Sequence, residues 1–488
     1  MEVSMKKRKL CAMLSLILAL LLLSSCSLER YSGEDPKDSV TQDTASKEDP
    51  SEKPQKPEDE KIYRYSGNPD YPIMASAYLK SLPERDFNGA TFFITSPDTS
   101  FMDPNGIHFV SETVAKRNKA VEEKYNIKIQ TTRADSNFML DDAKQASLAG
   151  MYYTNIMCIP FGDVGVFDAE GLLMNFRSVP LMDTTAPYFN QSSVKALSAG
   201  NKIYGVAGEA TPATDLPCVI YNKSIAENAS LPDLYTLALE GGFTWDKLLE
   251  YSAAVDASTG VAGSSLGGGE SYDHIFVSLG ESYIFSNELK IPSGGVANYS
   301  MNWSATYARY MLNNASAVGI TKETSRDSFA AGKVLFTLGT VDKLDDYRNP
   351  DVLVGILPMP KASAEAPYRS AASKNALIMT IPDKSTNSEM SSLVISALNA
   401  ASYGYMTEEK VSYLHATTLP DNRSADVLEL ISRSAVYNLA TAFESTVPEI
   451  SSMKNVIRDI IEVGDFTLFD KSVEDMNTAL KKKFPLQY

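Results

Sequence analysis

The chain contains few of the residues that usually carry catalysis or bind metals. Its 488 residues include four cysteines, three histidines and two tryptophans. So few cysteines exclude a disulfide-based scaffold, and His108, His274 and His415 are too far apart in the sequence to suggest a site by their spacing. The motifs of a zinc-binding helix, a paired-cysteine site, a phosphate-binding loop and a dinucleotide fold are all missing. The sequence therefore predicts neither a metal site nor a cofactor.

Positive charge is also scarce. The chain has 61 acidic and 45 basic residues, which gives a net charge of -16. A nucleic-acid backbone would be repelled on average, and no basic, aromatic-interleaved stretch offsets this repulsion. We therefore expect no nucleic-acid partner. The composition, with 44% hydrophobic and 22% charged residues, is typical of a globular protein with a sizeable core.

The first residues have the pattern of an export signal. A basic cluster at 6–9 precedes an apolar run, 10–23, that is too short for a stable membrane span. The run ends in Leu-Ser-Ser-Cys at 23–26, which resembles the bacterial lipobox, where the cysteine takes a diacylglycerol group. We predict a signal peptide over 1–25 and a lipidated Cys26 that anchors the protein at the extracytoplasmic face of the cell membrane. The alternative, an uncleaved hydrophobic anchor, would also export the body of the chain.

Two further segments separate this anchor from the body. Residues 26–61 are rich in acidic residues and proline and contain few apolar side chains, which predicts a disordered, extended tether. Residues 62–88 form a lead-in segment with several tyrosines that can pack on the body. Pro69, Pro72 and Pro83 are expected to interrupt any regular element in it.

The body, from residue 89 onward, alternates strands and helices. Buried strands are predicted at 90–94, 127–130, 155–159, 202–206, 218–221, 334–338, 354–357 and 377–379. The predicted helices include 112–125, 141–148, 245–255, 389–402, 425–434 and 473–483. This order predicts the α/β class, with crossover connections and helices on both faces of a sheet.

Two features have a chemical interpretation that the sequence does not favour. Gly-Ser-Ser-Leu-Gly at 263–267 matches the nucleophile elbow of serine hydrolases, but no strand precedes it and no helix follows it. We therefore interpret it as a flexible loop. Cys158 and Cys218 have the apolar neighbours of buried strands, which predicts inert core thiols; the sequence leaves open whether they pair.

A series of segments follows a characteristic order along the body. They are LPERDFNG (82–89), RNKAVEEKYNI (117–127), GLLMNF (171–176), APYFN (186–190), YNKS (221–224), FTWDKLL (243–249), FAAGKVLF (329–336) and GILPMPK (355–361). In this order they resemble the extracellular solute-binding lipoproteins of bacterial ABC importers, of the maltose-binding-protein type. The resemblance covers most of the body.

This resemblance implies a two-lobed α/β fold, the type II periplasmic-binding-protein fold with hinge crossovers, whose lobes close on a ligand. We expect lobe 1 to comprise 89–210 and 334–379, and lobe 2 to comprise 211–333 and 380–488. The crossovers are expected near 211–219, 328–334 and 380–382.

Ligand contacts are expected in loops that follow strands and face the cleft between the lobes. A sugar needs aromatic rings to stack on its apolar face and polar groups to bind its hydroxyls. The candidates of both kinds are Phe161, Asp163, Glu209, Asp215, Trp245, Trp303, Thr340 and Arg369. Trp245 follows the N-cap candidate Thr244 and shares a helix face with leucines, so a core position is its alternative.

The resemblance implies capture of a small solute, foremost a carbohydrate or oligosaccharide, by a monomeric protein that serves ABC permease subunits and catalyses no reaction. Two alternatives stay open. One is a peptide-binding or sensory lipoprotein of the same fold, because fold alone does not separate sugar from peptide. The other is an exported hydrolase, which depends on the Gly-x-Ser-x-Gly match.

Overall fold

The structure is a computed structural model. It describes residues 68–105, 109–199, 201–255, 261–266, 270–285, 296–297, 304–310, 325–349, 351–419 and 421–484. All of these belong to one unit of the chain, Lys61–Tyr488. The predicted signal peptide, Cys26, the tether and Trp303 lie outside the described residues. Within the described part, no helix is long and apolar enough to span a membrane.

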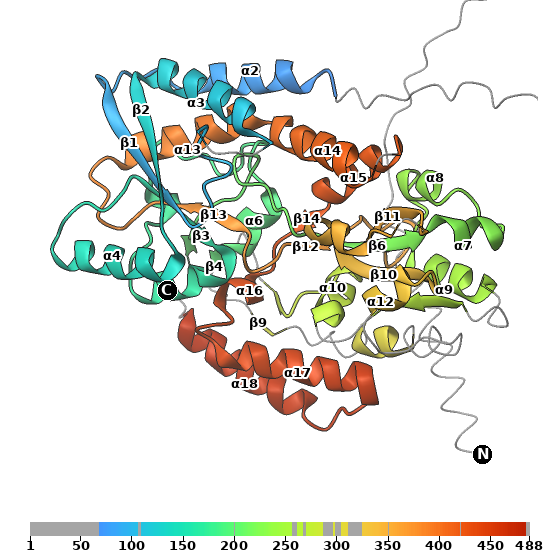
Figure 1. Cartoon of the computed structure of the whole chain (residues 1–488). Helices are drawn as coiled ribbons and strands as arrows, with labels where there is room; N and C mark the ends of the chain where they lie inside the picture. Colours follow the sequence, from blue (N-terminus) through green and yellow to red (C-terminus); the bar gives the residue numbers. More distant parts are fainter. Residues whose placement is uncertain are drawn as a thin grey trace, which may run out of the picture. The chain divides into compact units, whose positions relative to one another are not determined.

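Two four-stranded sheets form the framework of this unit (Figure 1). The first, in the order β13-β3-β1-β2, contains β1 (Ala90–Ser96), β2 (Ile127–Arg133), β3 (Ile156–Pro160) and β13 (Leu377–Thr380). The second, in the order β11-β6-β10-β7, contains β6 (Pro217–Asn222), β7 (Ala262–Ser265), β10 (Val334–Thr340) and β11 (Val354–Pro358). The predicted strand at 202–206 is reduced to the two-residue β5 (Lys202–Ile203).

Helices cover both sheets. They are α2 (Tyr71–Ser81), α3 (Ser111–Tyr125), α4 (Ser136–Leu148), α5 (Val164–Ala169), α6 (Gln191–Ala196), α7 (Lys223–Asn228), α8 (Leu234–Leu239), α9 (Trp245–Ala254), α10 (Glu270–Ser278), α12 (Ser325–Ala330), α13 (Ser388–Ser402), α14 (Tyr405–Thr417), α15 (Ser424–Arg433), α16 (Leu439–Phe443), α17 (Pro448–Val463) and α18 (Phe469–Lys483). The remaining short elements are β4 (Ser198–Ala199), β8 (Ile284–Phe285), β9 (Val296–Ala297), β12 (Ser370–Ala371), β14 (Ala435–Val436), η1 (Phe161–Asp163), η2 (Phe176–Ser178) and η4 (Val341–Tyr347).

The first sheet follows from two crossover connections. β1 is parallel to both β2 and β3, with Ala90 opposite Ile127 and Ile94 opposite Ile156. The connection through α3 leads from β1 to β2 at the edge of the sheet, and the connection through α4 leads in the opposite direction, from β2 past β1 to β3. Because both crossovers are right-handed, α3 and α4 lie on opposite faces of the sheet. Figure 1 shows α3 beside α2 and α13, with α4 on the other side of the sheet. The predicted arrangement of helices on both faces is therefore confirmed for this sheet.

The second sheet corrects the predicted division into lobes. β6 is antiparallel to both β10 and β11, so β10 and β11 belong with β6 and not with β1 to β3. The assignment of 334–379 to lobe 1 is therefore wrong for these two strands, whereas β13 does join the first sheet. The expected return crossover at 328–334 is also wrong, because the chain leaves the second sheet only after β11. Such errors arise because strand pairing is long-range and leaves no local signal.

Two local predictions also need correction. The lead-in segment contains the regular helix α2, because Pro72 falls in its first turn, where proline is tolerated. The glycine-serine motif at 263–267 is not a loop at its start, because 262–265 form β7 and pair in parallel with β10. A Cβ at Gly263 would lie 2.1 Å from the backbone oxygen of Ser252 in α9, so the glycine allows α9 to pack closely on the strand.

The core accounts for the cysteines. Cys158 on β3 and Cys218 on β6 are both buried and unpaired. Burial raises the pKa of each thiol to about 12, so neither forms the reactive thiolate at neutral pH. The prediction of inert core thiols is confirmed.

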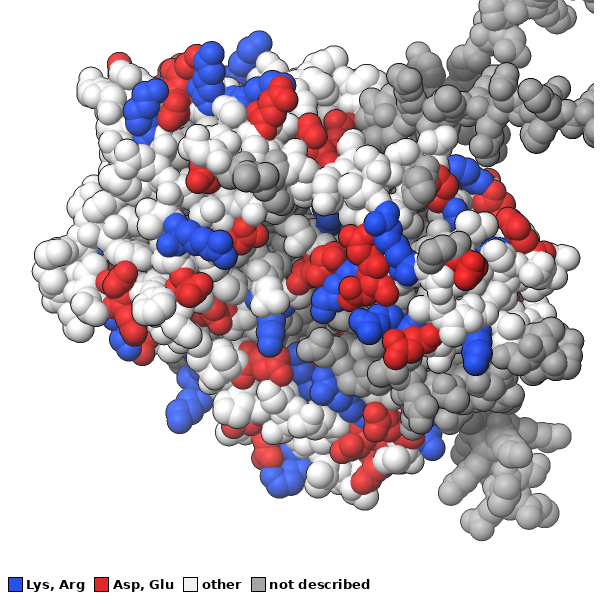
Figure 2. All heavy atoms as spheres, in the orientation of Figure 1, with Lys and Arg blue, Asp and Glu red and all other residues white. Residues whose placement is uncertain are grey.

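The surface mixes charges of both signs. On the face drawn in Figure 2, Lys and Arg side chains lie among Asp and Glu side chains over most of the area. The acidic side chains on this face therefore do not form a single negatively charged patch.

Candidate functional site

The site is built from segments that run between the two sheets. Residues 207–216 lead from the first sheet into β6, and residues 359–376 lead from β11 back to β13. The second of these contains β12, which pairs in parallel with β14. The Ser370 N–H donates to the Ser434 backbone oxygen at 2.9 Å, and the Ala372 N–H donates to that of Val436 at 2.8 Å. The second connecting segment is therefore held by the chain around β14.

Asp215 lies at the end of the first connecting segment and accepts a hydrogen bond from the Ser373 hydroxyl. Lys410, from α14, donates to the backbone oxygens of Ala213 at 3.2 Å and Thr214 at 3.1 Å. Lys410 is only 5% exposed. Burial lowers its pKa to about 8, and the nearby Asp215 opposes that shift. We call Asp215, Ser373 and Lys410 the Asp215 group; it joins both connecting segments to α14.

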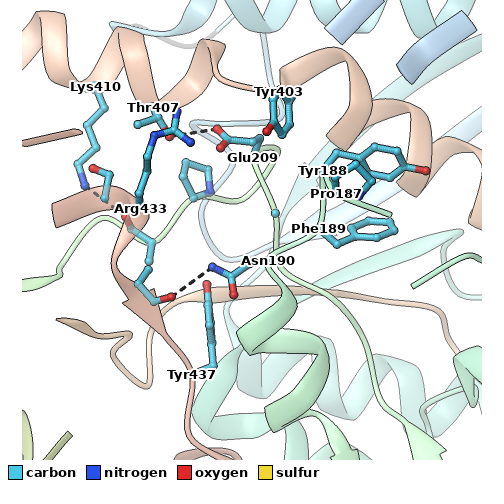
Figure 3. A pocket seen from close by; sticks show the side chains of 15 residues that line it. Pro187, Tyr188, Phe189, Asn190, Glu209, Tyr403, Thr407, Lys410, Arg433 and Tyr437 are labelled. Carbon is cyan, nitrogen blue, oxygen red and sulfur yellow. Dashed lines mark hydrogen bonds between the residues drawn. The ribbon is translucent and has the colours of Figure 1, made fainter. Parts of the chain in front are cut away.

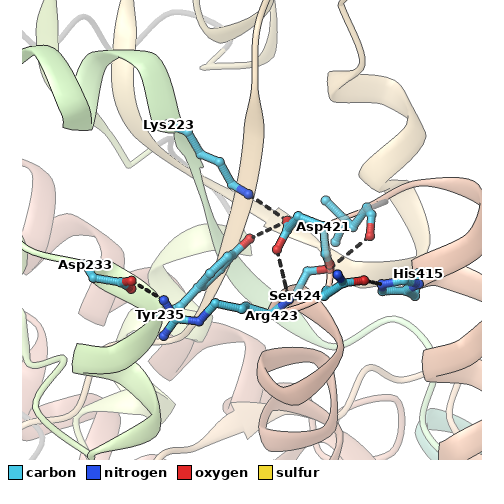
Figure 4. A network of polar contacts seen from close by, with 9 residues as sticks. Lys223, Asp233, Tyr235, His415, Asp421, Arg423 and Ser424 are labelled. Carbon is cyan, nitrogen blue, oxygen red and sulfur yellow. Dashed lines mark hydrogen bonds and ion pairs between the residues drawn. The ribbon is translucent and has the colours of Figure 1, made fainter. Parts of the chain in front are cut away.

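A polar network holds α14 in place for this contact (Figure 4). Asp421, in the turn between α14 and α15, accepts from Lys223 at 2.6 Å and from the Tyr235 hydroxyl at 3.1 Å. Arg423, in the same turn, pairs with Asp233 at the start of α8. The helices of the second sheet are therefore tied to the corner of α14, which fixes the helix that carries Lys410.

The carboxyl end of β3 reaches the same connecting segments. The Phe161 N–H donates to the Ala376 backbone oxygen at 2.8 Å, and the Phe161 ring contacts the Tyr437 ring edge-on at 5.1 Å. Asp163 accepts from the Ser136 hydroxyl at 2.5 Å. The Gly162 N–H donates to the Lys374 backbone oxygen at 2.8 Å, so this end of β3 lies next to the segment that carries Ser373.

A cavity of about 180 Å³ adjoins this region (Figure 3). Lys410 and Tyr437 line it, and so do Glu209, Asn190 and Tyr403. Ligand sites usually measure roughly 300 to 1,000 Å³. The cavity by itself is therefore too small for an oligosaccharide.

Glu209 is the carboxylate of this cavity. It accepts from the Thr407 hydroxyl at 3.0 Å. Burial raises the pKa of Glu209 to about 7; its contacts with Thr407 lower it, and the nearby Glu429 and Glu408 raise it. Arg433 also lines the cavity, but its guanidinium pairs with Glu429 at 2.9 Å. Among the described residues, Glu209 has no ion-pair partner.

The other predicted site residues divide into two kinds. Thr340 ends β10 opposite Pro217, and the next residue donates from its N–H to the Leu216 backbone oxygen at 2.9 Å, so Thr340 lies beside the Asp215 segment. Arg369 precedes β12, is half-buried and pairs with no described residue. Together with Asp163, Asp215 and Glu209, these residues lie on or next to the connecting segments.

Two predicted contacts are corrected to core positions. Trp245 is fully buried at the start of α9, and its indole N–H donates to the Ser278 hydroxyl at 3.0 Å. The alternative core interpretation of Trp245 was therefore the right one, because the helical spacing of its apolar neighbours faces the core. Phe161 is also fully buried, and its ring packs edge-on against the Tyr437 ring. Trp303 lies outside the described residues.

Sequence reasoning missed three members of the site, Ser373, Lys410 and Tyr437. Lys410 lies inside a helix, where a lysine is usually solvated, and only the tertiary contact with Ala213 and Thr214 gives it a role. Tyr437 follows the two-residue strand β14, which is too short to leave a pattern. No sequence signal distinguishes Ser373.

Two sheets joined by paired connecting segments, with helices around them, define the two-lobed α/β fold of solute-binding proteins, and the predicted fold class is confirmed. Residues 183–390 match the family model of bacterial extracellular solute-binding proteins. The predicted resemblance to maltose-binding-protein-like solute-binding proteins is thereby also confirmed. No curated protein matches the sequence.

Solved structures share this fold at low sequence identity. The sugar-binding protein MalE from Xanthomonas citri is 12% identical, with a TM-score of 0.54 over 81% of this chain and 97% of that chain. The cyclic α-maltosyl-1,6-maltose binding protein from Arthrobacter globiformis is 11% identical, with a TM-score of 0.53 over 81% and 99%. A cyclo/maltodextrin-binding protein in complex with maltotetraose is 14% identical, with a TM-score of 0.52 over 81% and 98%.

Proposed function

We propose that this chain is a lipid-anchored extracellular solute-binding protein that captures a carbohydrate between its two lobes and delivers it to an ABC permease. The observation that carries the proposal is the convergence of Asp163, the Asp215 group and Tyr437 where the connecting segments pass between the sheets. The family match supports solute binding. The sugar ligands named for the similar structures support the carbohydrate class.

The proposed mechanism is differential stabilisation of a closed form. A solute that contacts elements of both sheets favours the arrangement in which they approach, and closure buries the solute. Asp163 belongs to the first sheet and Thr340 to the second, while Asp215 and Arg369 lie on the segments between them. In this proposal these four residues bind hydroxyls of the solute.

The solute leaves chemically unchanged. Ser265, the serine of the hydrolase-like motif, is only 2% exposed on β7, and its hydroxyl has no hydrogen-bond partner among the described residues. A nucleophilic serine needs a base within hydrogen-bond reach and an exposed elbow. Neither requirement is met at Ser265, so the hydrolase alternative loses its main support.

The remaining parts of the proposal concern attachment. Acyl chains on Cys26 would hold the protein at the outer face of the membrane, and the tether 26–61 would let the monomeric body reach the permease. Mass spectrometry of the protein from cell membranes would detect a diacylglyceryl group on Cys26. An unmodified N-terminus that begins before residue 26 would contradict the anchor.

Thermal-shift measurements with monosaccharides, oligosaccharides, amino acids and peptides test the function. A ligand at one hundred times its dissociation constant stabilises the protein by about 2.7 kcal/mol. We expect a shift with a glycan that is abolished in Asp215→Asn and retained in the exposed control Asp470→Asn. Shifts with peptides and none with any glycan would favour the peptide-binding alternative, and conversion of the solute would contradict the binding function itself.

A further inference from the structure

Helix α2 contacts helices that belong to different sheets. Along its length it packs on α13, which lies in the core of the first sheet. At its N-terminal end the Tyr71 hydroxyl donates to the Glu429 carboxylate of α15 at 2.7 Å. α15 packs on β11 of the second sheet and on α8. α2 therefore spans the boundary between the two lobes, and Figure 1 shows it lying over α13 and α14.

The Tyr71 ring lies on the turn that leads from α13 to α14. Gly404, in this turn, has a φ of 78°, a left-handed conformation that favours glycine. A Cβ at Gly404 would lie 2.2 Å from Cγ of the Tyr71 ring. The ring of Tyr403 meets the Tyr71 ring edge-on, with the ring centres 6.0 Å apart. Because a hinge moves by dihedral changes in a few such residues, a ring placed on Gly404 restricts movement at this turn.

α15 and α14 hold the N-terminal end of α2 by several contacts. The Arg433 guanidinium donates to the Tyr71 hydroxyl, lies 4.8 Å from the centre of the Tyr71 ring and pairs with Glu429 at 2.9 Å. The Asn68 N–H donates to the Glu408 carboxylate at 2.6 Å. The side chains of Arg433 and Glu429 are 39% and 21% exposed, so water can replace these contacts at a modest cost in free energy.

The rest of α2 is fastened to the first lobe. The Tyr78 ring meets the rings of Tyr403 and Tyr188 edge-on, with ring centres 5.1 and 5.9 Å apart. Beyond the helix, Arg85 pairs with Glu389 in the first turn of α13 at 2.7 Å. Tyr188 and Tyr403 also line the cavity described above (Figure 3). The two ends of α2 are thus attached to different lobes, and the N-terminal end has the more exposed contacts.

We propose that α2 is a clasp across the hinge: Tyr71, placed on Gly404 and bound by α15, holds the lobes in the arrangement described here, and release of this end frees the turn between α13 and α14. α2 is a single helix of eleven residues. A movement of α15 relative to α13 must therefore break the contacts of Tyr71 or those of Tyr78. The clasp acts on the lobes and makes no contact with the solute.

Two substitutions separate the ring from the hydroxyl. Tyr71→Ala removes the contacts with Gly404 and α15, whereas Tyr71→Phe keeps the ring on Gly404. Hydrogen exchange by mass spectrometry should show roughly tenfold faster exchange over 403–408 in Tyr71→Ala, and a smaller increase in Tyr71→Phe. Tyr307→Phe is the matched control, because the Tyr307 hydroxyl donates to Asp246 of α9 at 2.9 Å. It should exchange like the wild type at this turn.

The arrangement of the lobes gives the deciding readout. Spin labels at Glu123→Cys on α3 and Glu227→Cys on α7, both exposed, report the distance between the lobes. Cys11 and Cys26 are replaced by serine, and the buried Cys158 and Cys218 do not react. The unliganded Tyr71→Ala protein should show a second distance population that the wild type and Tyr307→Phe lack.

A wild-type distance distribution in a folded Tyr71→Ala protein would overturn the proposal, because a purely local packing role changes exchange at the turn without moving the lobes. If Tyr71→Ala does not fold by circular dichroism, Tyr71→Phe decides by the same criterion. Neither measurement uses a solute, so both are independent of the proposed solute-binding function.

The consequence for solute capture does rest on the proposed function. Apparent affinity depends on the population of the binding-competent arrangement, so the solute affinity of Tyr71→Ala should differ from that of the wild type by about threefold or more. Tyr307→Phe should bind like the wild type. Equal affinities despite altered lobe distances would overturn the link between the clasp and capture. Absence of binding in all three proteins would instead count against the proposed function.

Discussion

Asp215 and Glu209 are carboxylates on the same connecting segment, but their surroundings are opposite. Asp215 receives the Ser373 hydroxyl and lies near the ammonium group of Lys410. Glu209 receives only Thr407, and the charges that act on it most strongly are the acidic Glu429 and Glu408. The sequence positions are close, yet α14 and α15 present a cation to one carboxylate and like charges to the other.

The surroundings of the two carboxylates have different consequences for each side chain. The Ser373 hydroxyl and the buried Lys410 ammonium group fix the direction of the Asp215 carboxylate. Desolvation and the like charges of Glu429 and Glu408 raise the pKa of the half-buried Glu209 to about 7. Two carboxylates that are six positions apart thus lie in opposite electrostatic surroundings.

The largest expected effect comes from Lys410→Met. The variant leaves the backbone oxygens of Ala213 and Thr214 without their donor and Asp215 without its nearby cation. Because unsatisfied buried acceptors cost roughly 1 to 3 kcal/mol, we expect a loss of about 3 kcal/mol in the free energy of unfolding. Urea unfolding at neutral pH measures it.

The same variant has a pH signature. The pKa of Lys410 is about 8 in the fold and 10.5 in the unfolded chain, so the unfolded chain binds more protons between these values and wild-type stability rises with pH there. Lys410→Met should lack this rise, and the exposed control Lys247→Met should keep it. Equal stability of Lys410→Met and wild type would show that the Asp215 group does not require a buried cation for folding.

Ser373→Ala should have an intermediate effect. It removes the hydroxyl donor of Asp215, and hydrogen bonds to charged groups contribute about 1.5 to 3 kcal/mol. We expect a loss of about 2 kcal/mol in stability together with weaker solute binding by calorimetry. Ser363→Ala is the matched control, because Ser363 makes the same kind of contact to Glu365 at the exposed surface. Unchanged solute binding in Ser373→Ala would show that the orientation of Asp215 does not contribute to solute binding.

The smallest effect is expected for Thr407→Val. The Thr407 hydroxyl lowers the pKa of Glu209, so its removal should raise that pKa further and cost about 1 kcal/mol at pH 8, where the carboxylate is charged. At pH 5, where Glu209 is neutral in the fold, the loss should be smaller. Thr407→Ser, which keeps the hydroxyl, should restore the wild-type profile. An equal loss for Thr407→Val at both pH values would indicate a packing effect.

Local burial patterns predicted most of the secondary structure. The apolar strands β1, β2 and β3 and the amphipathic helices α3, α13 and α15 were visible because each buries one face or both. Partners of the strands were not visible, so β10 and β11 were predicted in the wrong lobe. Pro72 suggested an interruption, whereas a proline in the first turn is compatible with helix α2.

Only the site residues with a distinctive local sequence could be predicted. Asp215 lies between Pro212 and Pro217 on a segment that joins two sheets, and that context pointed to it. Lys410 and Ser373 are ordinary residues in the sequence, because their importance comes from contacts with chain segments far away. Trp245 shows the converse, since a residue type suited to sugar binding serves the core.

The N-terminal end of α2 carries a mechanical consequence. The Asn68 N–H donates to the Glu408 carboxylate at 2.6 Å, and the Tyr71 hydroxyl donates to Glu429 at 2.7 Å, so the helix begins on α14 and α15. Farther along, α2 packs on α13 beside the first sheet. A force on the chain that precedes residue 68 would therefore act on α14 and α15, which line the Glu209 cavity, before it reached either sheet.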